Sequence, residues 1–292
     1  LEHFDAIYLG AVGYPGVPDH VSLGDLLLKI RRGFDEYINL RPVKLLAGAP
    51  CPLAGIKRED IDMIVIRENS EGEYANVGAR LYPGTPQEVA LQTGVFSRKG
   101  CERVIRYAYE LARREKRSLT SISKGNALGY SMVFWDEIFE EIGRDYPDVE
   151  QKKLLVDAAS MFFVKDPGRF GVVVTSNLFG DILTDLGAAI AGGMGLAAGA
   201  NLNPEKKFPS MFEPIHGSAP DIAGQGKADP TATISAVALM LDHLGLPEVA
   251  AKVEAGVTAD MATRRGGAQR STSQIGDAIA EAVTAGTDTS SL

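Results

Sequence analysis

Apolar and polar residues are grouped along the chain in blocks that predict strands and helices in turn. Short apolar runs are typical of buried strands, and apolar residues three or four positions apart are typical of amphipathic helices. The predicted strands cover residues 5–12, 61–66, 118–123, 153–156 and 170–175. The predicted helices cover residues 22–39, 98–116, 131–146, 178–191, 232–244 and 275–285. Residues 83–92 and 198–209 are rich in Pro, Gly and Asn and are predicted as irregular loops. This alternation predicts an α/β fold with helices layered on a sheet.

Composition and charge narrow the class of protein. A chain of 292 residues is long enough for one large or two medium domains. A net charge of −8 disfavours nucleic acid or an anionic membrane surface as a partner. No apolar stretch is long enough to span a bilayer, no signal peptide is recognisable, and two cysteines are too few for a disulfide framework or a zinc site. We therefore expect a cytoplasmic protein without a nucleic-acid or membrane partner.

Two aspartates in the predicted helix 178–191 are the first candidates for chemistry. Asp181 and Asp185 are four residues apart and share one helix face. Their neighbours in sequence are apolar or small and include no Lys or Arg, which predicts burial, and a buried carboxylate must be paired, hydrogen-bonded or bound to a metal. Hard oxygen ligands favour Mg²⁺ or Mn²⁺. The alternative is a solvated pair on a helix surface. Asp157, after the predicted strand 153–156, is either a further oxygen ligand or a helix N-cap.

Three arginines suggest a site for carboxylates. Arg67 ends the predicted strand 61–66, and ligands of α/β sheets bind beyond the carboxyl ends of strands. Arg31 and Arg41 accompany it, and planar guanidinium groups hold carboxylates with two hydrogen bonds each. A surface salt bridge explains any one of them taken alone. Their combination indicates a substrate with two carboxylates.

Two further residues carry ionisable groups in loops. Tyr74 is either a proton donor or an amphipathic surface residue. Lys124 is either a general base with a lowered pKa or a solvated lysine. In residues 213–226, small residues allow a close backbone approach to a ligand, and Asp221 is suited to accept hydrogen bonds from a ribose diol. The alternative there is a long turn with an Asx motif. No G-x-G-x-x-G motif follows a strand, so any dinucleotide site has a different design.

Several motifs in a fixed order resemble one enzyme family. The runs NLRP (39–42), RENSEGEY (67–74), SKGN (123–126), TSNLFGDILTDLG (175–187) and FEPIHGSAPDIAGQGKADPTA (212–232) look like those of the β-decarboxylating dehydrogenases. That family includes isocitrate, isopropylmalate, and tartrate or D-malate dehydrogenases. The resemblance implies a two-domain isopropylmalate-dehydrogenase-like fold. Residues 1–36 and 192–292 would form a discontinuous cofactor domain that lacks its N-terminal strand and helix, and residues 37–191 the substrate and dimerisation domain.

The resemblance also implies roles for single residues. Three arginines would hold the substrate: Arg31, Arg41 and Arg67. Tyr74 would donate a proton to carbon and Lys124 would be the catalytic lysine. The ligands of Mg²⁺ or Mn²⁺ would be Asp157, Asp181 and Asp185. Lys124 and Asp157 would come from the partner subunit, which implies a homodimer with shared active sites. The cofactor would be bound by His216, Gly217, Ser218, Ala219, Asp221 and Asp229, with Asp221 favouring NAD over NADP.

The expected reaction is an NAD-dependent and metal-dependent oxidative decarboxylation of a small 2-hydroxy dicarboxylate. The runs VPDHVSL (17–23) and ANLNPEKKFPSMFEPIHGSAPDIAG (200–224) resemble the tartrate/D-malate branch, so we expect D-malate to give pyruvate and CO₂, or tartrate to be oxidised. One alternative is a 3-isopropylmalate dehydrogenase in which Leu27 and Leu28 line an alkyl pocket. Another is a truncated, non-catalytic family member.

Three positions depart from the family pattern. The malate/tartrate branch usually has Trp where Gly24 stands, and the family usually has Asn where Asp229 stands. The Gly-rich turn with which the family begins is absent from the sequence, which starts at Leu1. From this last departure we expect the 292-residue chain alone to bind NAD weakly or to be poorly soluble.

Overall fold

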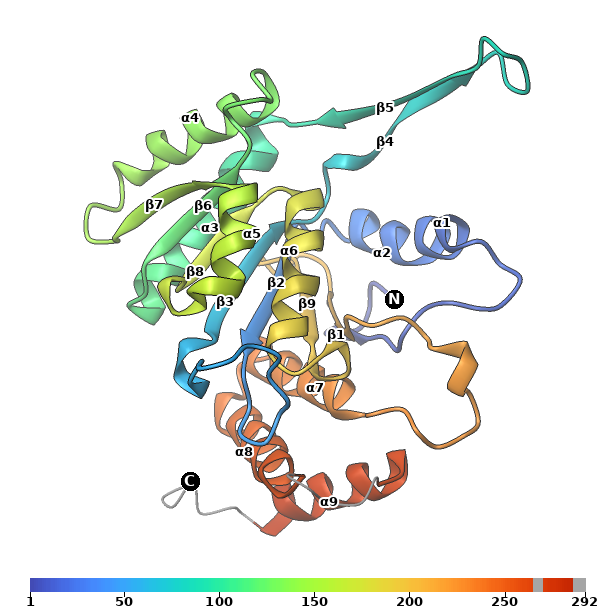
Figure 1. Cartoon of the computed structure of the whole chain (residues 1–292), viewed down its shortest axis with the longest axis vertical. Helices are drawn as coiled ribbons and strands as arrows, with labels where there is room; N and C mark the ends of the chain where they lie inside the picture. Colours follow the sequence, from blue (N-terminus) through green and yellow to red (C-terminus); the bar gives the residue numbers. More distant parts are fainter. Residues whose placement is uncertain (265–269, 286–292) are drawn as a thin grey trace. The chain divides into compact units, whose positions relative to one another are not determined.

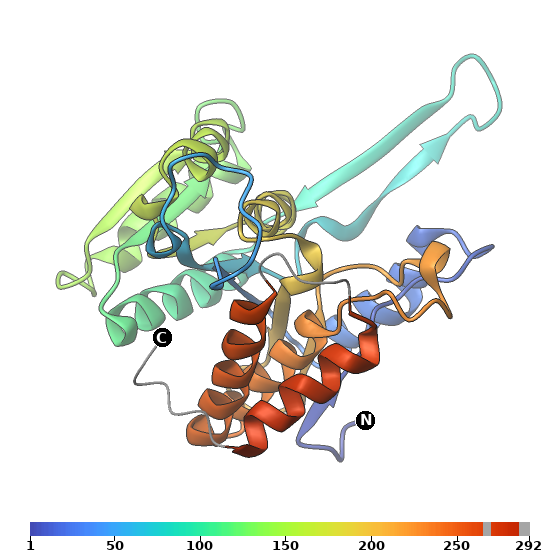
Figure 2. The same ribbon diagram turned by 60° about the horizontal axis from the view of Figure 1, so that its bottom comes forward.

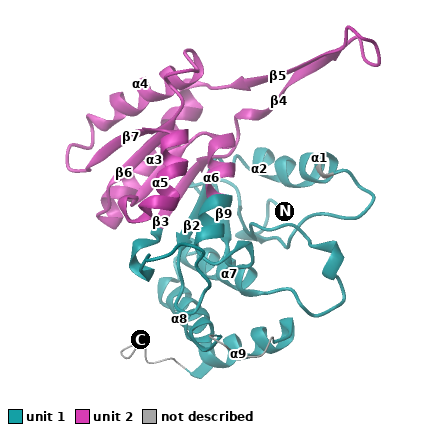
Figure 3. Ribbon diagram, viewed as in Figure 1, with its two compact units in different colours: residues 1–62, 185–292 teal, residues 63–184 magenta. Residues whose placement is uncertain are grey.

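A computed structural model describes residues 1–264 and 270–285 (Figure 1). The predicted α/β class is confirmed by the order of strands and helices along the chain. The chain divides into two compact units (Figure 3). The first unit contains Leu1–Asp62 and Asp185–Leu292, and the second contains Met63–Thr184. The predicted division assigned residues 37–62 and 185–191 to the other domain, and the role of each unit stays a prediction.

Four strands form the sheet of the first unit. Their order is β1 (Ala6–Tyr8), β10 (Ser210–Pro214), β9 (Ala198–Leu202) and β2 (Ile38–Lys44). Strand β1 is parallel to β10, whereas β9 is antiparallel to both β10 and β2. The prediction of an irregular loop over residues 198–209 was wrong for its first half, because β9 lies between two strands and all five of its residues are buried. Its residues Ala, Gly and Asn have low strand propensity, so only the pairing reveals it.

Helices cover this sheet and supply much of its core. The helical segments of the first unit are α1 (Asp19–Ser22), the π-helical η1 (Leu23–Leu27), α2 (Leu28–Gly33), η2 (Arg58–Asp60), η4 (Met194–Leu196), η5 (Pro220–Ile222), α7 (Thr231–His243), α8 (Pro247–Thr263) and α9 (Thr272–Ala285). Helices α8 and α9 lie side by side (Figure 2) and bury a cluster that includes Val257 and Ile279. A second cluster joins Leu27 to Ile7 and Met211. The predicted helix 22–39 ends at Gly33, and its last residues belong to β2.

The second unit is built on a parallel sheet. Its order is β3 (Asp62–Glu68), β8 (Val172–Thr175), β6 (Leu119–Ser123) and β7 (Gln151–Leu155). The helical segments are α3 (Arg98–Glu115), α4 (Ser131–Gly143), α5 (Val156–Lys165), η3 (Pro167–Arg169) and α6 (Asn177–Ile190), the last of which continues into the first unit. The carboxyl ends of parallel strands meet at one edge. Four candidate residues therefore lie along this edge, each at or just after the end of a strand: Arg67, Lys124, Asp157 and Asn177.

A two-stranded antiparallel hairpin extends from the second unit (Figure 1). It consists of β4 (Gly72–Leu81) and β5 (Val89–Val95), paired at positions such as Val77 and Thr93. Most of its side chains are exposed. The predicted loop 83–92 contains the turn but also the first half of β5. Strand β4 carries Tyr74 at its buried end, so the hairpin places a candidate site residue.

Candidate active site

Arg67, the arginine predicted at a strand end, is bound to two side chains of helix α6. Its Nε and Nη2 donate to Asn177 Oδ1 over 3.0 and 2.7 Å, and its Nη1 donates to Asp181 Oδ1 in an ion pair. Tyr74 donates its hydroxyl to the other oxygen of Asp181 over 2.9 Å. The Arg67 side chain is 3% exposed and that of Asp181 is 40% exposed. The second unit thus unites the predicted substrate arginine, proton donor and metal ligand in one cluster.

Gly180 permits this arrangement. A Cβ on Gly180 would lie 2.6 Å from both Cβ and Cγ of Arg67, closer than side-chain contacts allow. The side chain of Arg67 therefore runs across helix α6 at a residue that has no side chain. Because Gly180 also lies one residue before Asp181, the same turn of the helix provides both the space and the carboxylate.

The environment of Tyr74 keeps its phenol protonated. Partial burial raises the pKa of Tyr74, and the charge and hydrogen bond of Asp181 raise this pKa further, whereas Arg67 opposes them. The Arg67 guanidinium carbon also lies 5.5 Å from the centre of the Tyr74 ring. A protonated tyrosine beside a carboxylate is suited to donate a proton rather than to accept one.

Lys124 and Asp157 form a second group in the same unit. Lys124 Nζ lies 2.9 Å from Asp157 Oδ1, and this bond lowers the pKa of the Asp157 carboxyl. The Asp157 side chain is 65% exposed, so solvent screens the pair. Asp157 lies in the first turn of α5, whose N-cap position is Leu155, so the N-cap alternative is not what the structure shows.

The three predicted metal-binding aspartates do not lie close together within one chain. Among residues 1–264 and 270–285, no group of three His, Cys, Asp or Glu side chains is close enough to hold a metal ion. Asp185 is exposed and Asp181 partly exposed, so the prediction that this pair is buried was wrong. Other residues of α6 are buried, among them Leu183, Ala188 and Ile190, whereas Ile182 is exposed like Asp185. The donors themselves, carboxylate oxygens one turn apart, fit Mg²⁺ or Mn²⁺.

The other two arginines are linked by a chain of hydrogen bonds in the first unit. Arg31 Nη2 donates to Glu213 Oε1 over 2.8 Å, and Asn201 Nδ2 donates to the same oxygen over 2.8 Å. Asn39 Nδ2 donates to Asn201 Oδ1, and Arg41 Nε donates to Asn39 Oδ1 over 2.7 Å. Both arginines are 5% exposed. Arg31 and Arg41 are therefore held rigidly in one network, while their convergence with Arg67 stays a prediction.

Sequence reasoning missed Glu36 beside this network. Glu36 is fully buried, and burial raises the pKa of its carboxyl to about 8, with Arg31 lowering it and Glu213 raising it. Asn177, Asn39 and Asn201 were missed as well. The run around Asn177 and the NLRP motif contained two of these asparagines, but nothing local in the sequence gives their partners.

The predicted cofactor loop has an unsatisfied polar atom. Nε2 of His216 is buried and has no hydrogen-bond partner among the described residues. A Cβ on Gly217 would meet no heavy atom closer than 4.0 Å, and Ser218 lies against Gly13, where a Cβ would be 2.7 Å from the serine hydroxyl. Ala219 adopts a left-handed conformation with φ of 46°. Asp221, in η5, is exposed. An imidazole nitrogen without a partner at His216, uncrowded backbone at Gly217 and an exposed carboxylate at Asp221 are groups that could bind a dinucleotide.

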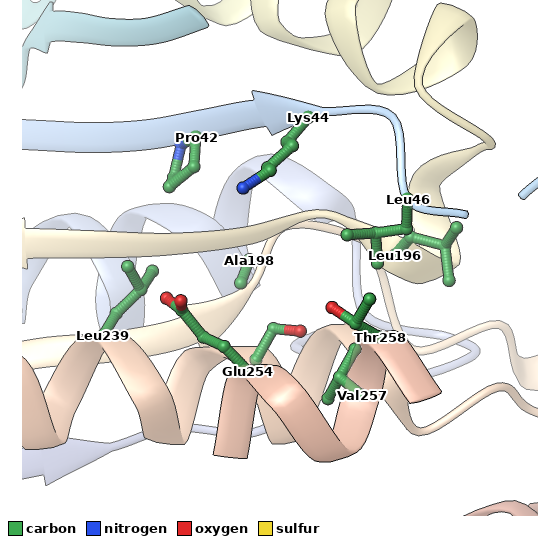
Figure 4. A pocket seen from close by; sticks show the side chains of 10 residues that line it. Pro42, Lys44, Leu46, Leu196, Ala198, Leu239, Glu254, Val257 and Thr258 are labelled. Carbon is green, nitrogen blue, oxygen red and sulfur yellow. The ribbon is translucent and has the colours of Figure 1, made fainter. Parts of the chain in front are cut away.

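A small cavity lies on the helix-covered side of the first unit's sheet (Figure 4). Its volume is about 150 Å³. Lys44 and Glu254 point into it from opposite walls, and the remaining lining includes Leu46, Leu196 and Leu239. Burial raises the pKa of Glu254, with Lys44 lowering it. No predicted site residue lines this cavity.

Comparison with known proteins places these residues in a family context. Residues 1–287 match the family described as isocitrate/isopropylmalate dehydrogenase. The 3-isopropylmalate dehydrogenase of Thermobifida fusca is 57% identical over 97% of this chain and 80% of the relative. The decarboxylating D-malate dehydrogenase of Escherichia coli is 56% identical over 84% of this chain and 68% of the relative. The crystal structure of isocitrate dehydrogenase from Methylococcus capsulatus superposes with a TM-score of 0.86 at 37% identity, covering 96% of this chain and 81% of that chain.

These findings correct the expected substrate. The Thermobifida fusca relative has a higher identity than the D-malate and tartrate relatives, and further relatives at 54–55% identity over 96–97% of the chain are also named 3-isopropylmalate dehydrogenase, whereas the D-malate relative covers 84% of the chain and the tartrate relative is 50% identical; this overturns the D-malate/tartrate prediction. Among the described residues, no helix combines the length and the apolar character that a membrane span requires. The resemblance to the family is confirmed over nearly the whole sequence. The chain belongs to the isocitrate/isopropylmalate dehydrogenase family.

Proposed function

We propose that the protein oxidises and decarboxylates 3-isopropylmalate with NAD and a divalent metal ion. The observation that carries this proposal is the 57% identity to a 3-isopropylmalate dehydrogenase over 97% of the chain. Family membership supports the reaction class, and the unsatisfied His216 Nε2 in the predicted cofactor loop supports a nucleotide ligand.

The space at Gly24 supports an alkyl-bearing substrate. A Cβ on Gly24 would meet no heavy atom within 4 Å, so the position opens onto free space. Gly24, Leu28 and Arg31 follow one another at roughly helical spacing, which places an apolar side chain between the open position and the carboxylate-binding arginine. Leu27 is instead part of the core with Ile7 and Met211, so it does not line an alkyl pocket.

The side chains of this protein have distinct roles in the proposed reaction. Arg31, Arg41 and Arg67 hold the two carboxylates of the substrate, and their buried networks fix their orientation. Lys124 accepts the proton of the 2-hydroxyl group as the alcohol is oxidised to the ketone. Tyr74, which is held protonated, then delivers a proton to the carbon from which CO₂ departs. The metal, bound by the aspartates, would supply Lewis-acid stabilisation of the oxygen on C2 and NAD would accept the hydride.

The proposed active site needs two subunits. The described part of one chain unites Asp181 with Arg67 and Tyr74, but Asp157 pairs with Lys124 in a separate group. We propose that Lys124 and Asp157 of one subunit complete the site of its partner. The dimer would then be required for turnover.

A substrate panel tests the proposal. The kcat/KM for 3-isopropylmalate, D-malate, tartrate and isocitrate would be measured with NAD and Mn²⁺. We expect 3-isopropylmalate to have the highest value. Because a Trp side chain would fill the open space, Gly24→Trp should lower kcat/KM for 3-isopropylmalate at least about 100-fold and that for D-malate much less.

Gly33→Trp is the matched control, because a Cβ on Gly33 also meets no heavy atom within 4 Å. Gly33 lies at the end of α2, two residues after Arg31. Its variant should keep the wild-type preference. A wild-type enzyme that prefers D-malate, tartrate or isocitrate would refute the proposed substrate.

A further inference from the structure

A buried aspartate near the end of helix α8 organises two arginines. The side chain of Asp260 is 2% exposed. Its Oδ2 accepts from Arg264 Nη2 over 2.6 Å and from Arg264 Nε over 2.8 Å, and its Oδ1 lies 2.8 Å from Arg270 Nη1. A carboxylate with so little access to water is stable only when it is paired, so Asp260 fixes the orientation of the Arg264 guanidinium.

The same guanidinium holds Asp229. Arg264 Nη1 donates to Asp229 Oδ2 over 2.6 Å, and Arg264 Nη2 donates to Thr231 Oγ1 over 2.8 Å. The other oxygen of Asp229 accepts from the backbone N–H of Thr231 over 3.0 Å, which satisfies a free donor in the first turn of α7. The two oxygens of Asp229 therefore have different partners: one accepts from the first residue of α7, and the other accepts from Arg264.

This pairing explains why Asp rather than Asn occupies position 229. An asparagine can still offer one oxygen to Thr231, but it would turn an amide N–H group toward the guanidinium of Arg264. Two donors would then face each other without an acceptor. The carboxylate at Asp229 and the arginine at position 264 therefore depend on each other.

Asp229 and Arg264 form the polar part of a cavity of about 460 Å³ in the first unit. Gly195, Leu196 and Met261 contribute to its glycine-rich and apolar remainder. The segment just before Asp229 is tied in place, because Thr272 donates its backbone N–H to Gly226 O over 2.8 Å and its hydroxyl to Ala228 O over 2.5 Å. The cavity wall is thus preformed from η4, the end of α8 and the end of the predicted cofactor loop.

We propose that Arg264 is a positioning residue for the bound dinucleotide, acting through Asp229, which the family resemblance assigns to the cofactor site, and through the segment 226–229. This inference rests on the proposed use of NAD. The charges of Arg264 and Arg270 are balanced by the two carboxylates Asp260 and Asp229, so the two arginines offer no surplus positive charge to a 2′-phosphate. The contribution of Arg264 is to hold the wall formed by Asp229 in the conformation that cofactor binding requires.

The test is equilibrium binding of NAD to the full chain, followed by calorimetry. Arg264→Met should raise the Kd for NAD about 10- to 100-fold, since a hydrogen-bonded charge pair is lost from the wall. Asp229→Asn should raise it by a similar factor, and the double variant should be no weaker than the weaker single variant, because both remove one interaction. Arg264→Lys, which keeps the charge, should fall between wild type and Arg264→Met. The KM for the hydroxy acid at saturating NAD should stay unchanged.

Arg113→Met is the matched control, because Arg113 donates to Asp148 with both Nε and Nη2 on the surface of the second unit. It should leave the Kd for NAD unchanged. If wild type binds NAD and Arg264→Met and Asp229→Asn bind it equally well, with only a lower melting temperature, the pair is purely structural and the inference is refuted. Additive losses in the double variant would also refute it. If wild type does not bind NAD at all, the proposed function itself fails.

Discussion

The buried carboxyl of Glu36 makes the stability of this protein sensitive to pH. Glu36 follows helix α2, is fully buried, and lies close enough to Arg31 and Glu213 for both charges to affect its pKa. Burial raises this pKa from 4.5 to about 8, because the charged form is poorly solvated there. The folded protein therefore keeps a proton on Glu36 at pH values where the unfolded chain has lost it.

The sign and size of the effect follow from proton linkage. Between pH 4.5 and pH 8 the folded state binds more protons than the unfolded state, so the free energy of unfolding falls as the pH rises through this window. From pH 5 to pH 8 this group alone removes about 3 kcal/mol of stability. In Glu36→Gln the neutral amide replaces the protonated carboxyl and does not titrate. As the pH rises from 5 to 8, the free energy of unfolding of the variant should therefore increase by about 3 kcal/mol relative to that of wild type. This change corresponds to roughly 6 °C in melting temperature.

Denaturant unfolding at fixed protein concentration, repeated at pH 5, 6, 7 and 8, measures this difference. Glu281→Gln, on the exposed face of α9, is the control. Its plot of unfolding free energy against pH should be parallel to that of wild type. Parallel curves for Glu36→Gln and wild type would show that Glu36 does not carry a raised pKa. A Glu36→Gln variant that becomes less stable than wild type as the pH rises would show that Glu36 is ionised and paired with Arg31, which is the reverse of the reasoning.

Three further predictions concern the candidate active site. Gly180→Ala should lower the free energy of unfolding by about 1–3 kcal/mol and displace Arg67, because the new methyl group overlaps Cβ and Cγ of Arg67. Denaturant unfolding measures the loss of stability and kcat/KM measures the displacement; a variant with wild-type values of both would contradict the prediction. Asp181→Asn should lower Mn²⁺ affinity and turnover at least about 100-fold, tested by Mn²⁺ titration, and unchanged affinity would remove Asp181 from the metal site. Lys124→Ala and Arg67→Ala chains should each be inactive, yet random reassembly should restore about a quarter of wild-type activity if sites are shared between subunits. No recovery in heterodimers confirmed by tagged co-purification would place Lys124 in the site of its own subunit.

Local sequence determined the features that depend on short-range geometry. The spacing of Asp181 and Asp185 puts them one turn apart on α6, and the apolar run before Arg67 places this arginine at a strand end, as predicted. Most helices and the parallel strands of the second unit were predicted within a few residues for the same reason. The family motifs added roles for these residues that spacing alone does not give.

Only the tertiary structure decided which side chains meet. Arg67 binds Asp181 across 114 positions, and Arg31 binds Glu213 across 182 positions, because strand order brings distant segments together. The sequence near Asp181 contains no basic residue, so local reasoning predicted a buried carboxylate. In the structure Asp181 is partly exposed and pairs with an arginine from β3. Strand β9 has weak propensity and exists because its neighbours pair with it. Helix and strand periodicity are encoded over a few residues, whereas the partner of a buried charge depends on how the whole chain is connected.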